Sequence, residues 1–153
     1  MADLREALTA AQAYRAAAEA ALAERLAHAP IDREQRAAHG FAWVATTVAA
    51  HEAVLSWCES GQDSNPLDAK VAALAFAEGI GQLVGGLPMG QNEIFRPADL
   101  GLGAEARSLA DSCADLLDAD HAVTRADVAM ALADGKWPSE TLHDADLDSI
   151  RDQ

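Results

Sequence analysis

The side chains best suited to chemistry lie on one stretch of the chain, from His39 to Glu52. His39 and Trp43 share a face of a predicted helix, and His51 lies beside Glu52 further along it. Such histidines could bind a metal or act as a general base. A zinc or di-iron bundle, however, needs Glu-x-x-His pairs or similar clusters on facing helices, and the later segments do not supply them. We therefore interpret these histidines as core or boundary residues, and we predict no metal site.

Three other motifs are incomplete. The glycines from Gly79 to Gly85 resemble a dinucleotide-binding loop, but their spacing is wrong and no predicted strand precedes them. The stretch Asp118–Ala122 lacks the third acid, the turn glycine and the closing glutamate of a calcium loop. No serine has a glycine-elbow context, and Cys58 and Cys113 lack the basic neighbours that activate a thiolate. We predict no catalytic or cofactor-binding residue in this chain, and two buried thiols instead of a disulfide.

The most particular segment runs from Gly85 to Pro97, with the sequence GGLPMGQNEIFRP. Its glycines can end the preceding helix, and its prolines stiffen the backbone on both sides. One interpretation is an ordered connection between two helices, with Ile94 and Phe95 anchored in the core. The other is an interface in which the loop meets a partner surface. The candidate interface residues are Met89, Gln91, Asn92, Glu93, Phe95 and Arg96.

The remaining segments are predicted to be helical, because apolar residues recur at helical spacing and alanine is the commonest residue. Five helices are expected, at Asp3–His28, from Asp32 to the polar loop that begins at Glu59, and at Pro66–Val84, Leu102–Asp118 and Thr124–Gly135. We predict an all-α fold without strands. It is a compact irregular bundle of about five helices, with the second and third at its centre and an ordered Gly/Pro-rich loop between the third and fourth.

Local signals mark several helix ends. Asp32 with Gln35, and Thr124 with Asp127, have the spacing of a capping box. Asn65 precedes a proline that suits the first helical position. The first helix carries a narrow apolar stripe made of Leu4, Leu8, Ala11, Ala18, Leu22 and Leu26.

The net charge of −14 and the pI near 4.5 argue against two classes of partner. An acidic surface repels the phosphate backbone of nucleic acids and the anionic headgroups of membranes. The N-terminus lacks the basic and apolar regions of a signal peptide, and no stretch approaches the roughly 18 apolar residues of a membrane span. We expect a cytoplasmic protein with neither nucleic acid nor membrane as a partner.

The end of the sequence has the pattern of another amphipathic helix, with Asp144, Asp146, Leu147, Ile150 and Arg151. Acids near its start suit the helix dipole. Since a finished domain seldom ends just after a helix start, we predict that the chain is the front piece of a longer polypeptide. Residues 1–137 would form a helical N-terminal domain, and residues 138–153 a linker and the start of a following domain.

Two stretches carry a family resemblance. The loop sequence GGLPMGQNEIFRPADLG and the helical sequence AAHGFAWVATTVAAHEAV resemble the N-terminal helical extension of (2S)-methylsuccinyl-CoA dehydrogenases. These are flavoenzymes of the acyl-CoA dehydrogenase family that act in the ethylmalonyl-CoA pathway. The resemblance is strongest from about Ala37 to Leu102, and the terminal LDSIRDQ resembles the start of the dehydrogenase body. Thr46 and Thr47 stand where we expect Thr-Tyr in this family.

The resemblance implies a part in the oxidation of an acyl-CoA thioester, in which a carboxylate takes the α-proton and FAD takes the β-hydride. The base, the flavin site and the coenzyme A groove of the family lie in the dehydrogenase body. No catalytic, cofactor or metal residue is therefore assigned to this chain, and FAD is implied only for the full-length enzyme. The implied role is a non-catalytic N-terminal domain that packs on the body of the same polypeptide or on a sister subunit of a homo-oligomer.

Two alternatives stay open at this point. A free-standing helical adaptor would bind a protein partner through its alanine-rich first helix. A small-molecule sensor would use Trp43, Trp57 and Phe76 to line a cavity of roughly 300 Å³ or more. The sequence offers no polar constellation that would orient a ligand in such a cavity.

Overall fold

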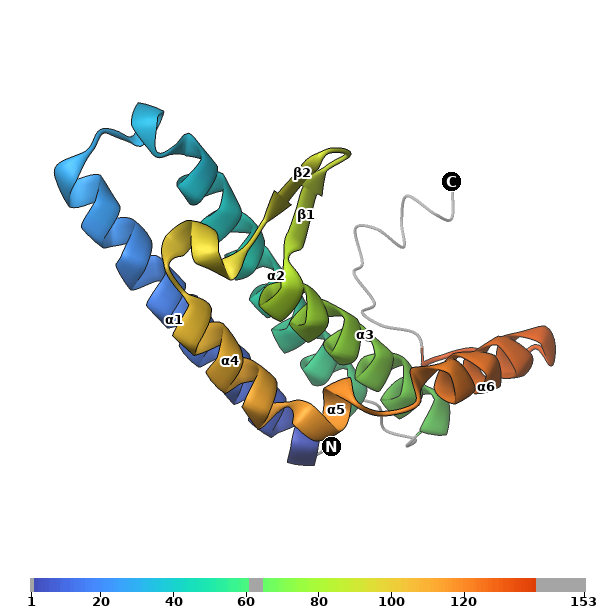
Figure 1. Ribbon diagram of the computed structural model, residues 1–153. Helices are drawn as coiled ribbons and strands as arrows, with labels where there is room; N and C mark the ends of the chain where they lie inside the picture. The colour runs from blue at the N-terminus through green and yellow to red at the C-terminus, as the bar shows by residue number, and fades with distance from the viewer. Residues whose placement is uncertain (1, 61–64, 140–153) are drawn as a thin grey trace.

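The computed structural model describes residues 2–60 and 65–139, and these ranges are largely helical (Figure 1). The α-helices are α1 (Ala2–His28), α2 (Gln35–Ser60), α3 (Pro66–Gly85), α4 (Gly103–Ser112), α5 (Ala114–Leu117) and α6 (His121–Ala133). The other described elements are the 3-10 turns η1 (Ile31–Arg33) and η2 (Pro97–Leu100) and the strands β1 (Leu87–Gly90) and β2 (Glu93–Phe95). The predicted all-α class is confirmed.

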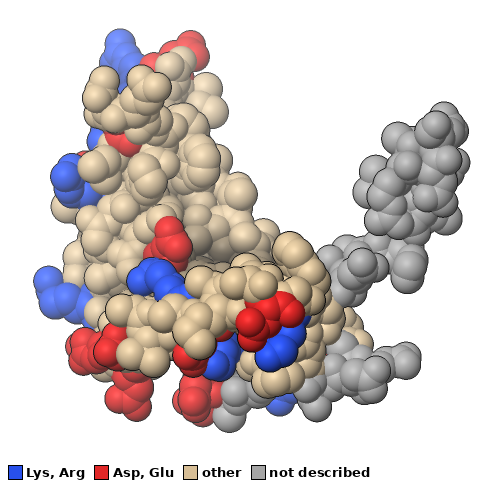
Figure 2. Space-filling model, turned by 90° about the vertical axis from the view of Figure 1, so that its right-hand side faces the viewer, with Lys and Arg blue, Asp and Glu red and all other residues tan. Residues whose placement is uncertain are grey.

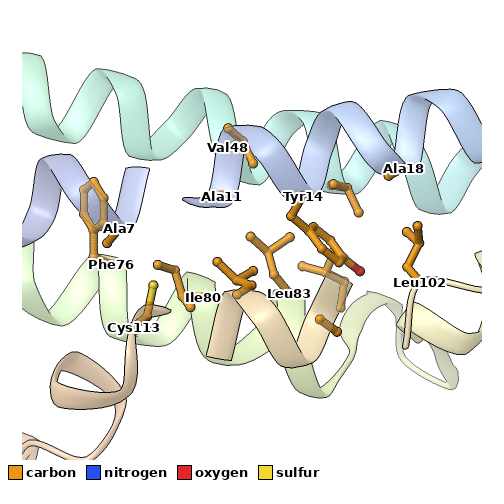
Figure 3. Packing of buried hydrophobic residues seen from close by; sticks show 14 of the residues in the cluster. Ala7, Ala11, Tyr14, Ala18, Val48, Phe76, Ile80, Leu83, Leu102 and Cys113 are labelled. Carbon is orange, nitrogen blue, oxygen red and sulfur yellow. The ribbon is translucent and has the colours of Figure 1, made fainter. Parts of the chain in front are cut away.

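The centre of the core lies between α2 and α3, as predicted. The largest fully buried side chains come from these helices and from β2, and they are Val44, Val48, Phe76, Ile80, Leu83 and Phe95. Helix α1 packs against α2 and α4, and α4 also packs against α3. The four helices therefore enclose one hydrophobic cluster, which Figure 3 shows from close by.

The buried face of α1 follows a regular three-and-four spacing through Leu4, Ala7, Ala11, Tyr14 and Ala18. This spacing keeps one narrow stripe turned toward the neighbouring helices. Alanine dominates the stripe, so the backbones can approach closely, and Tyr14 is its one aromatic side chain (Figure 3). Leu26 at the end of the predicted stripe is 37% exposed, so the buried face ends before it.

Helix α3 begins as predicted, whereas α2 begins later. The side chain of Asn65 accepts a hydrogen bond from the N–H of Leu67 at 3.0 Å, and Pro66 occupies the first turn. Asp32 does not cap α2, because it lies inside the η1 turn and α2 starts at Gln35. A short 3-10 turn thus takes the place of the predicted capping box.

The predicted fourth helix divides into α4 and α5 at Cys113. The N–H of Cys113 lies 3.1 Å from the carbonyl of Leu109 and 3.2 Å from that of Ala110, so the last turn tightens before the chain changes direction. Cys113 is buried, as predicted, but Cys58 is only partly buried.

The last described helix also starts earlier than predicted. The side chain of Asp120 accepts a hydrogen bond from the N–H of Ala122 at 3.1 Å, so α6 begins at His121. Thr124 lies inside the helix and does not cap it. The end is as predicted, since Gly135 follows α6 with a φ of 74°, a conformation that favours glycine.

The prediction of a chain without strands is wrong. Strands β1 and β2 form an antiparallel hairpin inside the Gly85–Pro97 loop, with Leu87 opposite Phe95. Gly86, with a φ of 141°, turns the chain from the end of α3 into β1. Pro88 is tolerated because a two-stranded sheet has only edge strands. The hairpin extends beyond the end of α3 (Figure 1).

On the face that Figure 2 shows, charged side chains do not form one continuous region. Figure 2 shows acidic and basic groups in several places on one face of the molecule. None of the described helices combines the length and the apolarity that a bilayer crossing requires. The predicted helix start within residues 140–153 lies outside the described residues, so the division of the chain after residue 137 stays a prediction.

Candidate functional site

The base of the β1–β2 hairpin is part of the core. Phe95 is 1% exposed, and Leu87, its partner across the hairpin, is 3% exposed. The ring of Phe95 lies against α2 at Gly40, where an added Cβ would overlap the ring. Phe95 therefore anchors the hairpin, as the first interpretation of the loop expected, but that interpretation is wrong for Ile94, which is 42% exposed. The prediction that Phe95 is an interface residue is wrong because Phe95 is buried.

Arg36, in the first turn of α2, ties the hairpin to the helices. Its Nη1 donates to Glu93 Oε1 at 2.6 Å, and its Nη2 donates to the carbonyl of Ile94 at 2.8 Å. Nη2 also lies 3.3 Å from Asp99 Oδ2. Because the guanidinium is a planar fork of donors, this one side chain holds β2 and the η2 turn together.

Asp99 is the second fixed point of the hairpin base. Its Oδ2 accepts a hydrogen bond from the N–H of Arg96 at 2.8 Å, and its carbonyl accepts one from Arg25 Nη2 at 2.6 Å. The hydrogen bond from Arg96, helped by Arg36, holds the pKa of Asp99 below its ordinary value. The network joins α1, α2, β2 and η2, so two helices brace the hairpin.

The outer part of the hairpin is exposed. Gln91 and Asn92 form the exposed turn, and Ile94 is 42% exposed. Met89 is partly buried against the core, and Arg96 is exposed. We name Met89, Gln91, Asn92 and Ile94 the hairpin tip. Amide and apolar side chains of this kind can contact a protein surface, but none of the four is suited to acid–base chemistry at neutral pH.

Sequence reasoning missed the residues that brace the hairpin. Arg36 and its partner Glu93 are 57 positions apart, and no local pattern pairs residues at that separation. Arg25 and Asp99 were missed for the same reason. Gly40 carried the one available signal, because a glycine inside an apolar helix often marks a close contact.

The two histidines of α2 lie in different surroundings. His51 is 3% exposed and stacks on Phe76, with ring centroids 4.5 Å apart. Burial lowers the pKa of His51, and its Nδ1 has no hydrogen-bond partner among the described residues. His39 is exposed and accepts a hydrogen bond from Trp43 Nε1 at 3.0 Å. The interpretation as a core residue is confirmed for His51, whereas His39 lies on the surface.

Residues 2–60 and 65–139 support neither a metal site nor a ligand-sensing cavity. No three His, Cys, Asp or Glu side chains in these ranges gather as a metal site requires. A sensor cavity would need Trp43 and Phe76 on one wall, but Trp43 is 38% exposed while Phe76 is fully buried.

Comparison with known proteins gives one partial match. Over 75 residues, the chain is 33% identical to the (2S)-methylsuccinyl-CoA dehydrogenase of Cereibacter sphaeroides. The match covers 47% of this chain and only 14% of that protein. No protein-family model matches the chain, and no solved structure does. The similarity supports a relationship to the acyl-CoA dehydrogenase family.

Proposed function

We propose that this chain is a non-catalytic helical N-terminal domain of a FAD-dependent acyl-CoA dehydrogenase of the methylsuccinyl-CoA type. It packs on the catalytic body of the same polypeptide, or on a neighbouring subunit of a cytoplasmic homo-oligomer. The observation that carries the proposal is the 75-residue similarity to a (2S)-methylsuccinyl-CoA dehydrogenase, which amounts to 14% of that enzyme. A shared segment of that size is suited to be a module of such an enzyme.

The hairpin tip is the contact surface in this proposal. A braced projection loses less conformational freedom on binding than a mobile loop does. Phe95 in the core and the Arg36–Asp99 network supply that bracing. The tip joins the exposed apolar side chain of Ile94 to the amides of the turn, a mixture typical of protein contacts.

FAD belongs to the catalytic body in this proposal. Gly79 and Gly81 lie inside α3, so they do not form the loop between strand and helix that cradles a dinucleotide phosphate. Gly79 instead lets the ring of His51 lie against α3, where an added Cβ would overlap it. The described residues therefore do not fit the flavin, and no step of the oxidation is assigned to them.

To test the proposal, the dehydrogenase body encoded with this chain is expressed with and without residues 1–139. We expect removal of the segment to change oligomer size, measured by light scattering, or acyl-CoA specificity, measured by the rates with several acyl chains. Unchanged oligomer size, activity and specificity would contradict the proposal. So would the finding that no dehydrogenase body is encoded with the chain.

A free-standing helical adaptor is the second candidate, and the outward face of α6 favours it. Val123 is 58% exposed and Met130 is 66% exposed, two helical turns apart on one face. Trp137, shortly after the helix, is 70% exposed. Apolar side chains along one exposed helix face are typical of a surface that binds a partner. The apolar stripe of α1, by contrast, is buried in the bundle.

A further inference from the structure

A pocket of about 220 Å³ lies between α1 and α4. Ala10 and Ala13 of α1 line it, and because these side chains are short, the helices approach each other without filling the space. Polar side chains from both helices line the rest, and they are Tyr14, Glu105, Ser108 and Ser112. The pocket therefore combines a small apolar surface with several oxygen atoms.

Tyr14 is the buried member of this set. It is 3% exposed, and Figure 3 shows its ring leaving α1 toward α4, with the hydroxyl at the far end. No described residue forms a hydrogen bond with this hydroxyl. Burial, and next the negative charge of Glu105, raise the pKa of Tyr14 to about 12. The phenol is therefore protonated at neutral pH and able to accept or donate a hydrogen bond.

The other polar groups of the pocket are available as well. Within the described part of the chain, no Lys or Arg pairs with Glu105, and the hydroxyls of Ser108 and Ser112 form no hydrogen bond. Glu105, Ser108 and Ser112 are exposed, and the hydroxyl of Tyr14 is open to the pocket, so a ligand that enters the pocket can reach all four groups. These oxygens share one property, which is that each can accept a hydrogen bond.

We propose that this pocket binds a small organic cation, an alkylammonium or an alkylguanidinium. Glu105 supplies the opposite charge, the oxygens of Tyr14 and the serines accept the N–H donors, and the alanines contact the alkyl chain. The net charge of −14 raises the concentration of cations at the surface. A carboxylate or phosphate ligand would instead meet the like charge of Glu105.

The volume of the pocket limits the size of the ligand that it can bind. A volume of about 220 Å³ corresponds to roughly seven water molecules at about 30 Å³ each, which suits a group of a few carbons and nitrogens. Coenzyme A and flavins are much larger, and their phosphates would be repelled. The inference is thus independent of the proposed dehydrogenase role, and either can fail without the other.

The test is an NMR titration of the full chain with butylguanidinium, with butanol and butyrate as neutral and anionic controls. For the cation we expect saturable shifts at the methyl groups of Ala10 and Ala13, with a dissociation constant on the order of 1 mM. Glu105→Gln and Tyr14→Phe should each weaken binding at least about fivefold, since each removes one favourable contact and keeps the shape. Glu24→Gln removes an exposed carboxylate elsewhere on α1 and should leave the affinity unchanged.

Three results would overturn the proposal. Shifts that grow linearly with concentration would show only weak general attraction by an acidic surface. An equal loss of affinity in Glu105→Gln and Glu24→Gln would show the same. Saturable binding of butanol as tight as that of the cation would show an apolar cavity without charge recognition. Thermal melting of each variant, followed by circular dichroism, establishes beforehand that it is folded.

Discussion

The ring of Phe95 lies against the backbone of Gly40, so the hairpin and α2 meet with no side chain between them at this point. We predict that Gly40→Ala destabilises the protein by about 1–3 kcal/mol, because the added Cβ overpacks the core. Urea unfolding followed by circular dichroism measures the change. Gly85→Ala is the control, because a Cβ at that position meets nothing within 4 Å. This variant should be as stable as the wild type or slightly more stable. Equal stabilities of the two variants would contradict the contact.

Arg36 holds the hairpin more than it holds the whole fold. Its side chain is 50% exposed, so we expect Arg36→Ala to lower the free energy of unfolding by only about 1 kcal/mol or less. Hydrogen exchange of the β1 and β2 amides should rise roughly fivefold, because the hairpin opens more often. Exchange measured by mass spectrometry tests this, with the exposed Arg33→Ala as control. Identical hairpin exchange in the two variants would rule out the bracing role.

Asp99 makes the free energy of unfolding depend on pH in the acidic range. Its pKa is lowered in the folded state, so its contribution is complete above the ordinary value of 3.8 and is lost as the pH falls below it. We predict that Asp99→Asn is less stable than the wild type at pH 7, and that its stability falls less steeply between about pH 4 and 2. Urea titrations across this range measure the slope. Asp111→Asn, on an exposed part of α4, should keep the slope of the wild type.

His51 adds a second pH dependence at milder acidity. Because burial lowers its folded pKa below 6.5, the unfolded chain takes up the proton first, and stability decreases as the pH falls below 6.5. We predict that His51→Gln removes this decrease while the wild type retains it. Stability curves between about pH 7 and 5 provide the measurement. His28→Gln, at the exposed end of α1, serves as the matched control, and a flat wild-type curve would refute the prediction.

The helices could be predicted where their signals are local. Asn65 followed by Pro66 marks the start of α3, and Gly135 follows the end of α6, because caps act within a few residues of the helix end. The break at Cys113 has no such signal, since it follows from how α4 and α5 pack on α3. The η1 turn was missed because Asp32 and Gln35 have the spacing of a capping box that the chain does not use.

The candidate site could be predicted only in its exposed part. Gln91 and Asn92 are typical turn residues, and their position at the tip follows from composition. The strands beside them have four and three residues, too few for an alternating pattern to be read from sequence. Without that alternation, the inward Phe95 could not be told from the outward Ile94, which is 42% exposed. The contacts of Arg36 join residues that lie far apart in the sequence, so they could be found only in the folded structure.

The claim that the hairpin tip binds the dehydrogenase body is tested most directly by calorimetric titration of the separately expressed body with the full chain. The decisive comparison is between Ile94→Ala and Met130→Ala. Both residues are exposed and apolar, but Ile94 lies on the hairpin and Met130 lies on α6. We predict that Ile94→Ala weakens binding about tenfold or more, as loss of an interface anchor does, and that Met130→Ala leaves it unchanged. No binding by the wild type, or a loss confined to Met130→Ala, would contradict the claim.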